Sequence, residues 1–331
     1  MLSGVGVILV IIIFLALLFD YINGFHDTAN AIATSVSTKA MSPRTAVTMA
    51  AILNFVGALS GTEVAKAIGK GIVEPQLVTP DVLVAAMLGA IFWNIFTWLL
   101  GIPSSSSHAL IGGTVGAVVA GHGFGALNLK GLTKIIESLI FSPIIGLISG
   151  FLVMTFLFWL VGRLSPAKVN HFFRKLQILS AAMMSFSHGS NDAQKSMGII
   201  TMALVSAGVL SDFRVPFWVI VSCATAMALG TAAGGWRIIK TMGGKIFKLE
   251  PINGFAADLN SSLVILTATH FGAPVSTTHV VSSSIMGVGT AKRMKAVRWG
   301  TAKTIVTAWV LTIPLSALVS AIIHYLTGFF F

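Results

Sequence analysis

The chain has 331 residues, of which 55% are apolar and only 9% are charged. Soluble domains carry about 25% charged residues to cover their surface, so this composition excludes a soluble globular protein. The single cysteine, Cys223, excludes an internal disulfide, a cysteine-based metal site and an iron–sulfur cluster. The net charge of +11 is better explained by basic cytoplasmic loops than by nucleic-acid binding. We therefore expect an all-α, multi-pass protein of the cell membrane.

The first half of the chain contains the elements of a membrane-crossing bundle. The run Gly6–Phe19 is apolar without interruption, which favours a membrane helix over the alternating strands of a barrel. This span continues into the polar segment Asn23–Asn30 (NGFHDTAN), and Val47–Ser60 returns across the membrane. A helical hairpin is expected around Pro103, and Lys134–Val161 crosses again.

The second half repeats this order. Gln177–Leu210 is a long apolar stretch that contains the polar segment Ser187–Lys195 (SHGSNDAQK), and Pro216–Ala233 returns. A second hairpin is expected around Pro274, followed by the last span, Lys303–Phe331. Because non-helical backbone at membrane depth survives only around a cavity, we predict helix breaks at both polar segments and at both hairpin tips. Whether the hairpins re-enter or cross the membrane fully stays open.

Two pairs of motifs indicate an internal duplication. Gly101–His108 (GIPSSSSH) and Gly272–His279 (GAPVSTTH) begin 171 residues apart, from 101 to 272. Gly24–Ala31 (GFHDTANA) and Gly189–Ser196 (GSNDAQKS) begin 165 residues apart, from 24 to 189. Both pairs predict two repeats, residues 1–165 and 166–331, in a single membrane domain with no soluble domain.

Loop charges orient the two repeats. Arg163–Lys175, Gly235–Glu250 and Lys292–Arg298 are strongly basic, and we place them in the cytoplasm. Gly61–Pro80 balances its charges and goes outside. Each repeat then has an odd number of crossings plus a hairpin, so the repeats are predicted to have inverted topology. His122–Lys134 fits poorly, because it is assigned outside yet carries two unpaired lysines.

Acidic residues inside apolar segments point to cation binding. Asp27 and Asp192 occupy matching positions of the two halves, where a charge costs about 2.5–3.5 kcal/mol on insertion scales. With Asn30 and Asn191 they offer the oxygen ligands that hard cations such as sodium prefer. Capping of a helical segment is the alternative role for each acid. Asp258 is a weaker candidate nearer the cytoplasmic side.

The hydroxyl-rich hairpin tips predict an anion site. Each tip follows a proline and begins a new helical segment, where free N–H groups and the positive end of the helix dipole attract anions. Back-bonding of the hydroxyls to the preceding turn is the alternative. Two facing tips would suit a tetrahedral oxyanion, with Gln194 as a further donor. The candidate anion-binding residues are Ser105, Ser106, Ser107, Gln194, Ser276, Thr277 and Thr278.

Other polar residues beside these motifs have less specific roles. Histidine titrates near neutral pH, so the four motif histidines could shuttle protons, although we favour neutral hydrogen-bonding partners that fix neighbouring loops. These are His26, His108, His188 and His279. Lys195 follows Asp192 by three residues and is expected to pair with it on one helical face.

Taken together, the motifs resemble those of the inorganic phosphate transporter (PiT) family, over essentially the whole chain. The resemblance rests on DTANA within GFHDTANA, on SHGSNDAQKSMGI from Ser187 to Ile199, and on both tips. It implies a secondary transporter that imports inorganic phosphate together with sodium or protons, forms a homodimer and needs no cofactor beyond the transported ions. It points to Asp27, Asn30, Asn191 and Asp192 for cations, and to Ser105–Ser107 and Ser276–Thr278 at the tips.

The chain departs from the family pattern at a few positions. Phe25 and His26 stand where the family usually has a small residue and Asn, and Gln194 and Lys195 replace Ala and Asn. These changes argue against a strictly symmetric pair of cation sites. Sodium is favoured over protons by the oxygen-rich segments. Two alternatives remain: a sulfate permease of the same fold, and an intramembrane serine hydrolase in which a tip serine is activated by His108 or His279.

Overall fold

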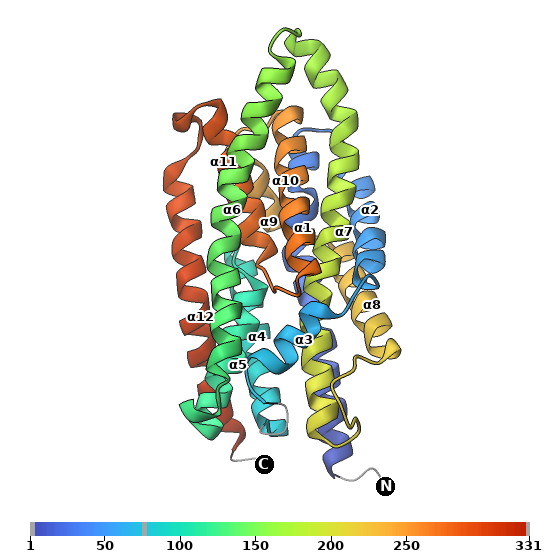
Figure 1. The fold of residues 1–331 in the computed structure, drawn as a ribbon, viewed down its shortest axis with the longest axis vertical. Helices are drawn as coiled ribbons and strands as arrows, with labels where there is room; N and C mark the ends of the chain where they lie inside the picture. Colours follow the sequence, from blue (N-terminus) through green and yellow to red (C-terminus); the bar gives the residue numbers. More distant parts are fainter. Residues whose placement is uncertain (1–3, 75–77, 329–331) are drawn as a thin grey trace.

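The computed structural model describes residues 4–74 and 78–328, and within these ranges every regular element is a helix (Figure 1). The first half contains α1 (Gly4–Ser37), α2 (Pro43–Ala58), α3 (Glu63–Gly71), α4 (Pro80–Leu100), α5 (Ser106–His122), the short 3-10 helix η2 (Phe124–Ala126) and α6 (Leu129–Val161). The second half contains α7 (Pro166–Ser206), α8 (Phe217–Ala233), α9 (Trp236–Gly244), α10 (Pro251–His270), α11 (Thr277–Lys292), the 3-10 helix η3 (Met294–Ala296) and α12 (Trp299–Thr327).

Four of these helices, α1, α4, α6 and α12, are long and apolar enough to cross a membrane. The pairs α2–α3 and α8–α9 pass the same test as bent units, with bends of 71° and 73°, which raises the number of spans to as many as six. Large apolar side chains such as Ile148 and Phe156 on α6 and Val310 on α12 are exposed, as lipid-facing residues are. The composition is therefore matched by a fold with several apolar spans.

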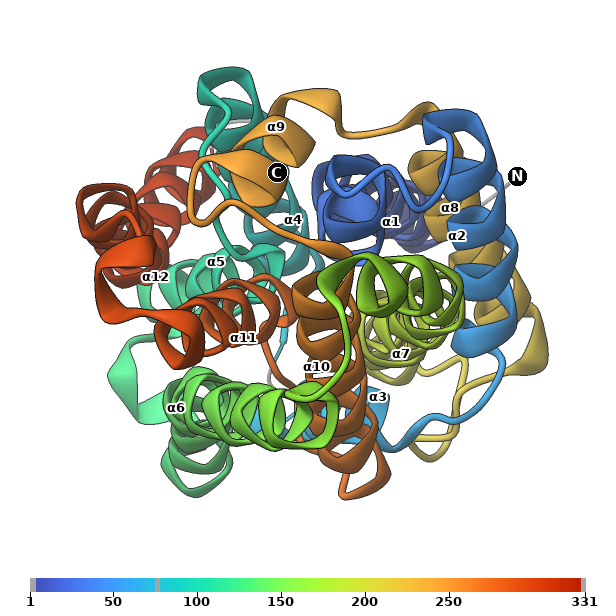
Figure 2. The ribbon, with the colours of Figure 1, turned by 90° about the horizontal axis from the view of Figure 1, so that it is seen from above.

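The order of elements is the same in the two halves, and corresponding helices at their beginnings and ends run in opposite directions. Figure 1 shows α1 rising from the end of the molecule that holds the N-terminus, whereas α7 descends from the other end. In the same way, α6 rises from the end that holds the N-terminus, and α12 descends from the other end. Viewed from above, α2 and α8 lie together on one side, and α6 and α12 lie away from them (Figure 2). The inverted topology stays a prediction that these directions support.

The two halves interlock rather than pack as separate bodies. α1 packs against α8 and α9 of the second half, and α7 packs against α2 and α3 of the first. Glycines allow the closest approach: a Cβ atom on Gly24 would overlap the carbonyl oxygen of Met227, and one on Gly189 would overlap that of Asn54. The boundary near residue 165 stays a prediction, and it falls at the short connection between α6 and α7.

The hairpins α4–α5 and α10–α11 enter from opposite ends of the molecule, and their tips meet near its middle (Figure 1). Ser107 Oγ on the first tip donates to the carbonyl oxygen of Val275 on the second at 3.1 Å. Each hairpin turns at a glycine with φ of 66°, Gly101 or Gly272, a conformation that glycine adopts without steric cost. Both hairpins thus turn back inside the fold.

The predicted helix breaks at the two polar segments are wrong. α1 runs without interruption through Asn23–Asn30, and α7 runs through Ser187–Lys195. Their polar side chains find partners on other helices, so the backbone keeps its own hydrogen bonds and no break is needed. The predicted breaks at the two hairpin tips are confirmed, and further breaks lie between α2 and α3 and between α8 and α9.

We predict that Gly189→Ala destabilises the protein by about 1–3 kcal/mol, because the added methyl group forces α7 away from α2 at the Asn54 carbonyl. Thermal melting of the purified protein in detergent measures the effect. Gly300→Ala on α12 is the matched control, since a Cβ atom there meets no other atom within 4 Å. Equal melting temperatures for the two variants would contradict the close packing of α7 against α2.

Candidate functional site

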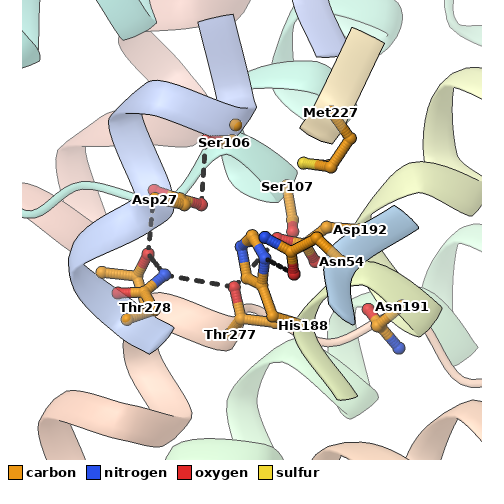
Figure 3. A network of polar contacts seen from close by, with 12 residues as sticks. Asp27, Asn54, Ser106, Ser107, His188, Asn191, Asp192, Met227, Thr277 and Thr278 are labelled. Atoms are coloured by element: carbon orange, nitrogen blue, oxygen red, sulfur yellow. Dashed lines mark hydrogen bonds and ion pairs between the residues drawn. The ribbon is translucent and has the colours of Figure 1, made fainter. Parts of the chain in front are cut away.

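Asp27 on α1 connects that helix to both hairpin tips (Figure 3). Its Oδ2 accepts a hydrogen bond from Ser106 Oγ at 3.1 Å, and its Oδ1 accepts one from Thr278 Oγ1 at 3.4 Å. The neighbouring His26 Nδ1 lies 2.6 Å from the same Oδ1. The other ring nitrogen of His26 lies 3.2 Å from Thr97 Oγ1 on α4. The carboxylate is thus held by helices of both halves.

Asp192 on α7 has a corresponding set of partners. Its Oδ2 accepts a hydrogen bond from Thr277 Oγ1 at 2.9 Å and lies 3.3 Å from His188 Nε2. Its Oδ1 forms an ion pair with Lys195, one turn further along the helix. Ser106 and Thr277 hold equivalent places in the two tips, so each acid is bound by the first helical residue of the tip in its own half.

The residues three positions after each acid reach across to the tip of the other half. Asn30 Nδ2 donates to Thr278 Oγ1 at 2.9 Å and to Thr277 Oγ1 at 3.3 Å. Lys195 Nζ donates to Ser107 Oγ at 2.5 Å and to the carbonyl oxygen of Val275 at 3.0 Å. Figure 3 shows Thr277 and Thr278, which accept the bonds from Asn30, beside the two acids. The cluster is therefore built from two signature helices and two tips.

The carboxylates of Asp27 and Asp192 lie close together in a buried position. Ligand atoms of these residues and of His188 all lie within 4.8 Å of one another, and the two acids are 3% and 0% exposed. Two buried carboxylates at this separation repel unless positive charge lies between or beside them. Asn30 Oδ1, also buried, has no hydrogen-bond partner among the described residues. These oxygen atoms are the ligands that a hard cation would use.

Each tip presents the start of a helix to this cluster, as expected. The N-terminal residue of α5 is capped by Ser105, whose Oγ accepts from the backbone N–H of His108 at 3.1 Å. Ser276 caps α11 in the same way, accepting from His279 N at 3.2 Å. The hydroxyls of Ser106 and Thr277 donate to the carboxylates rather than to the preceding turn. Two positive helix ends and their hydroxyls therefore converge on one place.

Three residues proposed as ligands from the sequence lie outside this cluster. Gln194 Oε1 accepts from the backbone N–H of Val64 at 2.8 Å and thereby caps α3. Asn191 contacts the base of the second tip rather than the acids: its Oδ1 accepts from the backbone N–H of Val275 at 3.4 Å, and its Nδ2 donates to Thr269 Oγ1 at 2.8 Å. Figure 3 shows its side chain pointing away from the two acids. Asp258 accepts both its hydrogen bonds from Thr34 Oγ1, at 2.7 and 2.8 Å. Their assigned roles stay predictions.

The sequence reasoning missed several members of the network. Asn54 Oδ1 on α2 lies 3.0 Å from His188 Nδ1 and fixes that ring beside Asp192. Asp20 on α1 is fully buried and accepts from Ser196 Oγ on α7 at 2.6 Å. The signal for Asp20 was available, since an acid directly after the apolar run is costly in a membrane. Asn54 gave no such signal, because its partner is set by the packing of α2 on α7.

The family follows from comparison with known proteins. The model of the family described as "Phosphate transporter family" matches residues 23–320. The chain belongs to this family. It is 53% identical over 328 residues to a Bacillus subtilis protein named "Probable low-affinity inorganic phosphate transporter", with 98% of each chain covered. A protein of the same name from Rhizobium meliloti is 51% identical over 320 residues, with 96% of each chain covered.

A solved structure supports the same assignment. The structure titled "The sodium-dependent phosphate transporter" superposes on this chain with a TM-score of 0.88 at 26% identity, covering 98% of this chain and 100% of the other. The resemblance to phosphate transporters seen in the motifs is confirmed, and the protein is a multi-pass membrane member of a phosphate transporter family. The relatives are named as transporters, which favours transport over serine hydrolysis.

Proposed function

We propose that this protein is a secondary symporter that imports inorganic phosphate together with cations, sodium being favoured over protons. The proposal rests on one observation: a hydroxyl of each hairpin tip donates a hydrogen bond to a buried carboxylate, Ser106 to Asp27 and Thr277 to Asp192. The hydroxyls are the donors that an oxyanion needs at the two helix starts. Membership of the phosphate transporter family supports phosphate as that oxyanion.

The geometry provides a physical reason for coupling. In the structure the hydroxyls of Ser106 and Thr277 donate to the carboxylates. A cation held by Asp27 and Asn30 Oδ1 offsets the negative charge of the carboxylate pair and weakens those hydrogen bonds. The hydroxyls then turn toward phosphate, which in turn is stabilised by the nearby cation. Neither ion enters the buried site favourably alone, because an unpaired charge in low dielectric is costly.

Sodium is favoured by the chemistry of the ligands and by the structural relative. The two carboxylates, the tip hydroxyls that donate to them and the buried amide oxygen of Asn30 are oxygen ligands that suit hard cations. The superposed structure is titled a sodium-dependent transporter. Phosphate is favoured over sulfate by membership of the phosphate transporter family. No cofactor beyond these ions enters the proposal, and the homodimer stays a prediction.

A basic pocket offers phosphate a path to the second tip. A cavity of about 440 Å³ is lined by Phe271–Pro274, directly before that tip, and by four lysines, with no acid among its described lining residues. The lysines are Lys66, Lys70, Lys130 and Lys134. Asn128 Nδ2 donates to the carbonyl oxygen of Lys70 at 3.1 Å, which joins the end of α3 to the start of α6 in segments that we assign to the outside. Two of these lysines, Lys130 and Lys134, lie in the segment that fitted the loop-charge rule poorly. At this pocket their positive charge would attract anions.

We expect the double variant Lys130→Gln and Lys134→Gln to raise the KM for phosphate several-fold at low ionic strength. The difference should shrink as salt is added, because the Debye length falls from about 30 Å at 0.01 M to about 8 Å at 0.15 M. Initial rates of radiolabelled phosphate uptake measure it. Lys240→Gln, an exposed lysine on α9, is the control. A salt-independent change in KM would argue against electrostatic attraction by this pocket.

The proposed function is tested by phosphate uptake into proteoliposomes containing the purified protein. A sodium gradient and a pH gradient are imposed separately, with excess unlabelled sulfate as competitor. We expect uptake that follows the sodium gradient and is unaffected by sulfate. Uptake that follows only the pH gradient would replace sodium by protons in the proposal. Absence of uptake under both gradients, with the protein folded, would overturn phosphate symport.

A further inference from the structure

Among the positions at which the two halves differ, one places a charged side chain against the ion cluster. Asn30 and Lys195 each lie three residues after the signature acid, so they occupy equivalent places in the repeat. Their contacts are equivalent too: Asn30 Nδ2 donates to Thr278 Oγ1, and Lys195 Nζ donates to Ser107 Oγ, the matching hydroxyl of the other tip. The first half therefore offers a neutral amide where the second half offers an ammonium group.

Lys195 occupies the position that a cation would take beside Asp192. Its Nζ is surrounded by the Asp192 carboxylate, the hydroxyl of Ser107 at 2.5 Å and the carbonyl of Val275 at 3.0 Å. Carboxylate, hydroxyl and carbonyl oxygens are also the ligands of a hard cation. The side chain is only 1% exposed, although lysine is almost never fully buried unless it is paired.

The charge of Lys195 determines how many mobile cations are needed to balance the two carboxylates. The cluster contains two carboxylates and one ammonium, so a single monovalent cation neutralises it. With a neutral residue at position 195 the same cluster would need two. Asn30 leaves its Oδ1 without a partner among the described residues, so the Asp27 side still has an oxygen free for a mobile ion, whereas the Asp192 side is already satisfied.

We infer that Lys195 is a built-in cation that replaces one mobile cation at Asp192, and that it thereby lowers by one the number of cations coupled to each phosphate. The inference rests on the proposed cation-coupled transport. Lys195 sets the stoichiometry by its fixed charge, and Asp27 with Asn30 binds the cation that remains mobile.

The test is the sodium dependence of phosphate uptake in Lys195→Asn, which gives the second half the residue of the first. We expect uptake at low sodium to fall at least tenfold and to recover at high sodium. The exponent with which the uptake rate depends on sodium concentration (the Hill coefficient) should be larger by one than in the wild type. The mirror variant Asn30→Lys places a second ammonium beside Asp27, and the exponent should fall by one. Lys195→Met keeps the length without charge or oxygen ligand, and sodium should not restore its uptake.

A purely structural lysine gives a different result. In that case Lys195→Asn would lower uptake by the same factor at every sodium concentration, and an unchanged exponent would overturn the inference. The binding step is measured separately as the rise in melting temperature of the detergent-solubilised protein when sodium chloride replaces choline chloride, with no phosphate present. Lys195→Asn should show a larger rise than the wild type, and an equal rise would again overturn the inference.

The two proposals fail in distinguishable ways. If the wild type transports no phosphate, the symport proposal fails, while the melting experiment still reports whether a sodium site appears at Asp192. If the wild type uses protons at Asp27, Lys195→Asn should acquire a sodium dependence that the wild type lacks. If wild-type uptake depends on sodium and the exponents of both variants equal the wild-type value, only the inference about Lys195 fails.

Discussion

Asp27→Asn is expected to lower cation-driven phosphate uptake by roughly 30-fold to several-thousand-fold. Removing one member of a buried, hydrogen-bonded charged pair costs about 2–5 kcal/mol, and every 1.4 kcal/mol is a factor of ten. Asp27 is the carboxylate of the cluster that no lysine neutralises, so the mobile cation depends on it most. Initial rates in proteoliposomes under a saturating sodium gradient measure the loss.

Two comparisons give this experiment its meaning. Asp212→Asn removes an exposed carboxylate from the loop between α7 and α8 and should leave uptake within about twofold, in keeping with the small effects of surface changes. Phosphate–phosphate exchange without a gradient reports whether the anion site survives. Asp27→Asn with wild-type uptake would remove this residue from the cation site, whatever its effect on exchange.

The motifs identified the central residues because hydrocarbon makes their placement costly. Asp27 and Asp192 stood out as acids inside apolar stretches, and the structure brings both within reach of the tips that were singled out for their hydroxyls. The start of a helix at each tip could also be predicted from the sequence, since a Pro and a helix-capping Ser precede both α5 and α11. Elements and clusters that repeat twice in one chain are the ones that sequence patterns predict best.

What the patterns missed depends on packing between the halves. The polar segments resemble helix breaks, yet they remain helical because Ser106, Thr277 and their neighbours satisfy the polar side chains from outside. Gln194 was expected to face an anion, but the proximity of α3 makes it a helix cap. Neither outcome follows from local sequence, because the partners of α1 and α7 come from helices that are distant along the chain.

The double variant Ser106→Ala with Thr277→Val is expected to raise the KM for phosphate by roughly 100-fold or more. A hydrogen bond to a charged group contributes about 1.5–3 kcal/mol, and one such donor is removed from each tip, which corresponds to at least tenfold for each. Valine keeps the shape of threonine, so packing of α11 changes little. Phosphate dependence of uptake at saturating sodium measures the effect.

Matched controls separate these donors from ordinary buried hydroxyls. Thr201 and Ser185 on α7 are buried like the tip residues, but their hydroxyls donate only to carbonyls of the preceding turn, at 2.7 Å in both cases. Thr201→Val with Ser185→Ala should therefore leave the KM within about threefold, since loss of a local bond leaves only a carbonyl that is already paired in the helix. If the control pair and the tip pair raise the KM equally, the tips do not bind phosphate. If only the tip pair raises it, the hydroxyls that donate to Asp27 and Asp192 also bind the anion. Because the same hydroxyls serve both the carboxylates and phosphate, binding of the cation and binding of phosphate are then coupled.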